Sequence, residues 1–103
     1  MIRHVVLFKR ASSVDAAAVA KVFSALKDLT SKISGIISIS TGHDCSPEGI
    51  QRGYTHGFTV DFIDAAARDA YLPHPAHQAV GKMIVSITEG GVDGICVVDW
   101  EMQ

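Results

Sequence analysis

The segment covering residues 2–10 predicts a β-strand that is apolar on both faces, and this feature most constrains the fold. Its centre, Val5–Phe8, is an uninterrupted run of apolar residues. Successive side chains of a strand point to opposite faces, so one face carries His4, Val6 and Phe8 and the other carries Val5 and Leu7. A strand that is apolar on both faces is covered on both faces in the folded protein.

The hydrophobic period changes several times along the rest of the chain, and these changes predict the order of the elements. Ser12 and Asp15 are typical of a helix start, apolar residues then recur at helical spacing to Ile33, and Gly35 is a natural stop. Further strands are expected over residues 36–41, 54–62 and 95–100, helices over 65–72 and 76–87, and a loop over 42–49.

The predicted order β-α-β-β-α(α)-β is the ferredoxin-like pattern of an α+β protein, an antiparallel sheet with helices on one face. A chain of 103 residues has no room for two independent cores, so residues 1–103 are expected to form a single domain. The helices leave the second apolar face of the first strand uncovered. A second copy packed sheet against sheet would cover it, because closed two-fold dimers are the commonest assembly, and we predict a homodimer.

Composition argues against several classes of partner. The chain has 9 Lys and Arg against 11 Asp and Glu, a formal net charge of −2, so we expect it to bind neither nucleic acid nor an anionic membrane surface. No apolar run is long enough for a signal peptide or a membrane span, and the expected location is the cytoplasm. Cys45 and Cys96 form no CxxC motif, so both are expected to be reduced thiols.

Histidines are the candidate functional residues, and the predicted elements bring four of the five close together. A neutral imidazole in an apolar cavity suits general base catalysis, and a tyrosine hydroxyl beside it can donate a hydrogen bond to a developing enolate oxygen. The candidate catalytic residues are His77 and Tyr71, and the candidate substrate-binding residues are His4, His56, His74 and Phe58. His43 falls in a predicted loop and is expected to be exposed.

A structural role for the same residues remains open. A histidine on an apolar strand, such as His4, is often a core residue that is hydrogen-bonded to a backbone carbonyl. His74 precedes Pro75 and suits a helix cap, and Tyr71 could pack its ring and leave its hydroxyl in water. No Asp or Glu is expected in the cluster, and its histidines come from separate elements, so we predict neither a metal site nor a cofactor.

Three segments together resemble the stress-responsive A/B barrel (Dabb) family: HVVLFK at residues 4–9, GYTH at 53–56 and YLPHPAH at 71–77. The resemblance covers nearly the whole chain. It implies a dimeric α+β barrel built from two ferredoxin-like units, in agreement with the argument from the two-faced strand.

The resemblance also implies a possible chemistry. One type of member, the plant polyketide cyclase that makes olivetolic acid, closes a linear polyketide by aldol condensation without a cofactor. Its base and its hydrogen-bond donor fall by motif on His77 and Tyr71, and its pocket histidines fall on His4 and His56. Plant members are also described with a magnesium ion near the end of the first helix. The matching stretch here, residues 33–36, has a glycine in place of a bulkier residue, so we predict no metal there.

Three functions follow as hypotheses. The first is a small dimeric Dabb protein with a pocket for a small apolar or aromatic metabolite and no assigned reaction. The second is a cofactor-independent enzyme, a cyclase of the polyketide type, a monooxygenase or an isomerase, with His77 as base and Tyr71 as donor. The third is a purely structural, stress-related dimer. A cavity beside Tyr71 and His77 would favour the first two, and a filled core would favour the third.

Overall fold

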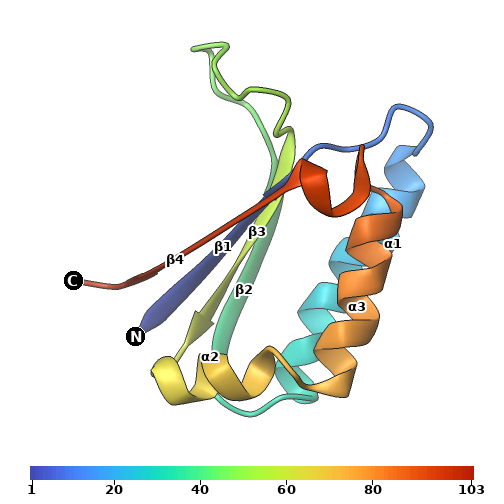
Figure 1. The fold of residues 1–103 in the computed structure, drawn as a ribbon. Helices are drawn as coiled ribbons and strands as arrows, with labels where there is room; N and C mark the ends of the chain where they lie inside the picture. Colours follow the sequence, from blue (N-terminus) through green and yellow to red (C-terminus); the bar gives the residue numbers. More distant parts are fainter.

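The computed structural model describes all residues from Met1 to Gln103 as a four-stranded antiparallel sheet with helices on one face (Figure 1). The elements in chain order are β1 (Ile2–Phe8), α1 (Ala16–Asp28), β2 (Ile36–His43), β3 (His56–Phe62), α2 (Ala65–Tyr71), α3 (Pro75–Ser86) and β4 (Ile95–Glu101). Short 3₁₀ turns follow α1 at Leu29–Ser31 and precede β4 at Gly91–Gly94. The predicted ferredoxin-like α+β fold is confirmed.

The strands lie in the order β2-β3-β1-β4, so β1 pairs with β3 on one side and β4 on the other. His4 lies opposite Val60 of β3 and Asp99 of β4. At the other end of β1, Phe8 lies opposite His56. This register fixes which side chains share one end of the sheet.

The helices cover one face only. In Figure 1, α1 and α3 lie side by side against the sheet, α2 lies near one end of it, and the loop between β2 and β3 projects from the opposite end. The covered face holds the core, whose largest fully buried side chains are Tyr71, Phe8, Phe62, Leu26, Leu29 and Val60. None of the helices is long and apolar enough to cross a membrane.

The other face of the sheet is open in the single chain and carries large apolar side chains. Leu7 on β1 is 41% exposed, and Val98 and Trp100 on β4 are 51% and 49% exposed. Val6 and Phe8 of the same strand are buried under the helices. The first strand is therefore apolar on both faces, as the sequence predicted. This open face is the surface for which a partner was predicted.

The boundaries differ from the predicted ones at several ends. β1 stops at Phe8 and β2 continues to His43, so His43 lies on a strand, although it is exposed as expected. Regular helix in α1 ends at Asp28, because the next turn tightens into 3₁₀ hydrogen bonding. Gly35 then takes φ +90°, and an added Cβ there would lie 2.6 Å from the Cβ of Ala67, so both conformation and space require glycine.

Candidate functional site

The junction between α2 and α3 positions His77. Pro75 begins α3, and the His74 side chain caps it by accepting a hydrogen bond from the Ala76 amide at 3.1 Å. The predicted role of His74 as a helix cap is therefore correct. With α3 anchored in this way, His77 lies in its first turn and faces back toward the end of α2.

A backbone hydrogen bond fixes the ring of His77. Its Nδ1 lies 2.9 Å from the carbonyl oxygen of Leu72, and because a carbonyl only accepts, Nδ1 must carry the proton. The lone pair of the neutral ring is then on Nε2. Burial lowers the pKa of His77 below its ordinary value, and the nearby His4 and His74 lower it further. The hydrogen bond to Leu72 acts in the opposite direction but is the smaller effect. Desolvation therefore favours the neutral form of His77.

Tyr71 lies between the two histidines of the site. Its ring centroid is 4.1 Å from that of His77 and 5.9 Å from that of His4. The side chain is fully buried, yet its hydroxyl has no hydrogen-bond partner within the chain. Burial raises the pKa of Tyr71, so the hydroxyl keeps its proton and remains a donor. A buried hydroxyl with no partner is costly.

His4 is held by a carboxylate that the sequence did not place in the site. Its Nδ1 lies 2.7 Å from Oδ1 of Asp99, and the other Asp99 oxygen accepts from Nη1 of Arg68 at 2.8 Å. Although burial acts to raise it, hydrogen bonds from Arg68 and His4 hold the pKa of Asp99 below its ordinary value. The expectation that no acidic residue belongs to the cluster was wrong, because the pairing of β1 with β4 puts Asp99 opposite His4. The signal was a single carboxylate within the apolar strand segment 95–100.

A cavity of about 470 Å³ opens beside these residues, between the sheet and α3. Seven of its twelve lining residues are hydrophobic, and the predicted residues His4, Phe58 and His77 are among them. The full lining is His4, Val6, Phe58, Leu72, His77, Gln78, Gly81, Lys82, Ile84, Val85, Ile95 and Val97. Tyr71 is buried directly behind the two histidines that line it.

His56 does not join this site. It lies at the opposite end of the sheet, where its ring centroid is 5.6 Å from that of Phe8 and 6.0 Å from that of His43. Burial lowers the pKa of His56, with further lowering by Arg10 and His43. The predicted convergence of four histidines is therefore wrong for His56, because β3 runs antiparallel to β1 and pairs His56 with Phe8 rather than with His4.

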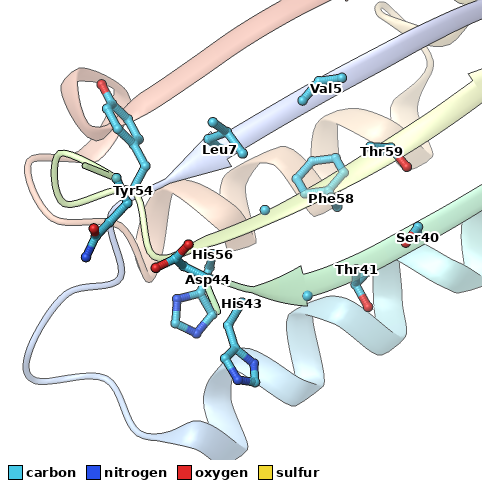
Figure 2. Close-up of a pocket in the computed structure, with 13 residues that line it drawn as sticks. Val5, Leu7, Ser40, Thr41, His43, Asp44, Tyr54, His56, Phe58 and Thr59 are labelled. Carbon is cyan, nitrogen blue, oxygen red and sulfur yellow. The ribbon is translucent and has the colours of Figure 1, made fainter. Parts of the chain in front are cut away.

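A second cavity of about 390 Å³ lies at this other end, along the open face and below the β2–β3 loop. Figure 2 shows Leu7 and Val5 on the open side of the sheet, and Tyr54, His56 and His43 near the end of the strands. Its position on the uncovered face makes it part of the surface where a partner would pack.

The stretch that would match the plant magnesium site offers no carboxylate to a metal ion. Apart from the Ser34 hydroxyl, residues 33–36 offer only backbone carbonyls, and the carbonyl of Gly35 already accepts a hydrogen bond from the Ile63 amide at 3.0 Å. Nowhere do three or more His, Cys, Asp or Glu side chains form a group that could hold a metal ion.

Comparison with known proteins agrees with this architecture. The model of the Stress responsive A/B Barrel Domain family, Dabb, matches residues 2–102. The chain belongs to the Dabb family. A similar family member is the stress-response A/B barrel domain-containing protein HS1 of Arabidopsis thaliana, 26% identical over 100 residues that cover 97% of this chain and 88% of HS1.

Solved structures with the same fold include proteins of assigned and of unknown function. A dimeric ferredoxin-like protein of unknown function from Jannaschia sp. CCS1 is 32% identical and covers 98% of each chain, with a TM-score of 0.89. The hydroxynitrile lyase from Passiflora edulis has a TM-score of 0.87 over 99% of this chain and 93% of its own, but is only 18% identical. That second likeness shows the fold of this Dabb protein and nothing of its activity.

Proposed function

We propose that this Dabb protein binds a small apolar or aromatic molecule in the cavity between the sheet and α3. The cavity of about 470 Å³ carries the proposal, because ligand sites are typically concave, mostly apolar and about 300–1,000 Å³ in volume. His4 and His77 are among the few polar groups that would orient a ligand.

The same proposal includes a homodimer formed through the open face of the sheet. Leu7, Val98 and Trp100 on that face are between 41% and 51% exposed, and a contiguous apolar surface of this kind is typical of an interface. The 32% identical Jannaschia protein is described as dimeric. A second copy of the same chain is therefore the occupant that we propose.

Gly81 offers a direct test of the cavity. It lies within α3 and lines the cavity, and a Cβ added there meets nothing within 4 Å. A Gly81→Leu variant should therefore fold and place its side chain in the space a ligand would use. Ala79→Leu, at an exposed position of the same helix, is the matched control.

The measurement is saturation-transfer difference NMR with 2-naphthol as the probe. We expect transfer to 2-naphthol in the wild-type protein and in Ala79→Leu, and little or none in Gly81→Leu. Equal transfer to all three proteins would place the probe elsewhere and argue against the cavity. Absence of transfer to the wild-type protein would favour the structural dimer.

A second candidate function, cofactor-independent proton transfer, is favoured by the pairing of Tyr71 with His77. Nε2 of His77 would remove an acidic C–H proton of the ligand. The Tyr71 hydroxyl is unpartnered but does not line the cavity, so its ring would have to turn toward the ligand to donate to the enolate oxygen that forms. Deuterium incorporation between the two carbonyls of ethyl benzoylacetate tests this step. We expect exchange above the buffer rate that is lost in His77→Gln; exchange that survives in His77→Gln would rule out His77 as the base.

A further inference from the structure

We propose that the ligand of this cavity carries a carboxylate group and that Lys82 binds it; this inference rests on the proposed ligand-binding function. Lys82 is one of the twelve lining residues and the only one of them with a permanent formal charge. No Asp or Glu lines the cavity. The nearby Asp99 does not offset Lys82, because its carboxylate already pairs with Arg68 and His4.

Lys82 is free of a carboxylate partner within the chain. Its side chain has no Asp or Glu oxygen within 4.0 Å. A lysine on a helix surface commonly pairs with an acidic residue three or four positions away. The whole of α3, PAHQAVGKMIVS, contains no acidic residue, and the positions four residues before and after Lys82 are Gln78 and Ser86. An exposed ammonium without a local partner, at the wall of an apolar cavity, is suited to an anionic ligand group.

Gln78 adds a second donor beside it. Gln78 and Lys82 both line the cavity and are four residues apart on α3, which places them on the same face of the helix. The amide N–H of Gln78 and the ammonium of Lys82 could therefore contact the two oxygens of one carboxylate. Leu72 and Val97, exposed apolar side chains, also line the cavity.

The positions on α3 also give the direction in which the ligand would extend. Lys82 follows His77 by five residues, which corresponds to about 7.5 Å along the helix axis. A carboxylate held at Lys82 would leave the apolar body of the ligand to extend toward His77 and His4. The expected class is therefore a small aromatic or aliphatic carboxylic acid.

Two probes of the same shape separate the charge from the apolar body. 2-Naphthoate carries the carboxylate, and 2-naphthalenemethanol is its neutral counterpart. Dissociation constants would be measured by isothermal titration calorimetry for the wild-type protein, Lys82→Gln and Lys82→Glu, with Lys27→Gln on the exposed face of α1 as the control. We expect the wild-type protein and Lys27→Gln to prefer the carboxylate by about fivefold, the contribution of one exposed charge pair.

The variants and salt give the remaining outcomes. Lys82→Gln should abolish the preference, and Lys82→Glu should reverse it. Raising the salt concentration should weaken both the preference of the proteins that retain Lys82 and the reversed preference of Lys82→Glu. Equal binding of both probes to the wild-type protein, or a preference that survives in Lys82→Gln, would overturn the carboxylate inference and leave the apolar cavity in place. Failure of both probes to bind would overturn the proposed ligand-binding function and the inference with it.

Discussion

The imidazole of His77 lies against the ring of Tyr71, with ring centroids 4.1 Å apart and planes inclined by 38°. The contact joins a base with a free Nε2 to a phenol with a free proton, since Nδ1 of His77 is bonded to the Leu72 carbonyl and the Tyr71 hydroxyl has no partner in the chain. Tyr71 is buried, and His77, which lines the cavity, is half-buried. Burial therefore makes His77 a weaker base and Tyr71 a weaker acid than the same side chains are in water.

Tyr71→Phe should leave the protein as stable as the wild type or more stable by about 1 kcal/mol. The substitution removes a buried hydroxyl that forms no hydrogen bond, so its desolvation cost disappears while the packing of the ring is kept. Urea unfolding measures the change. Tyr54→Phe, the only other tyrosine, is the control and should change little. A loss of more than 1 kcal/mol in Tyr71→Phe would mean that the hydroxyl has a structural partner.

His77 should titrate below 6.5 in the folded protein, because burial lowers its pKa. The unfolded chain binds this proton more readily than the folded one, so the free energy of unfolding should fall as the pH drops below about 6.5. NMR titration of the ring carbons gives the midpoint. Unfolding of His77→Gln should depend less on pH between 5 and 7 than that of the wild type. A midpoint at or above 6.5 would contradict the desolvated base.

The sequence was sufficient for the fold but not for the site. Element order follows from changes of hydrophobic period. The alternation of β3 correctly put Phe58 and Phe62 on one face, and in the structure that face is buried. Alternation assigns a face but says nothing of register. Register decides that His56 lies beside Phe8, away from His4, and that Asp99 lies beside His4. Residues 71–77 were placed correctly because a proline-broken turn fixes their proximity locally.

Asp99→Asn should destabilise the protein by about 1–2 kcal/mol at neutral pH. The carboxylate accepts charge-assisted hydrogen bonds from Arg68 and His4, and a side chain that is 20% exposed places the effect toward the lower end of that range. The pKa of Asp99 is lowered in the folded state, so its contribution is present above about pH 3.9 and is lost as the pH falls further.

Chemical unfolding at pH 7 and at pH 3 measures the contribution of Asp99. The difference between wild type and Asp99→Asn should shrink at the lower pH. Asp93→Asn, at a carboxylate in the turn before β4 that makes no ion pair, is the control and should differ little from wild type at either pH. A difference that is independent of pH would mean that the substitution acts through packing and not through the charge.

Val98→Glu should convert the proposed dimer into a monomer. Val98 lies on the open face of the sheet, opposite Val5 of β1, and is 51% exposed in the single chain. A two-fold dimer contains the substituted residue once in each copy. Each carboxylate would move from water into an apolar interface, which would cost several kcal/mol of dimerisation free energy. The single chain would tolerate the charge, because the position is exposed when no partner covers it.

Size-exclusion chromatography with light scattering distinguishes the two states, since the chain has a mass of 11.0 kDa. Val92→Glu is the matched control, because Val92 is 71% exposed and lies in the turn before β4 rather than on the sheet. We expect a dimer for the wild type and the control and a folded monomer for Val98→Glu, with an unchanged circular dichroism spectrum. A dimer in all three proteins would show that the copies associate through another surface, and the apolar open face would then need a different partner.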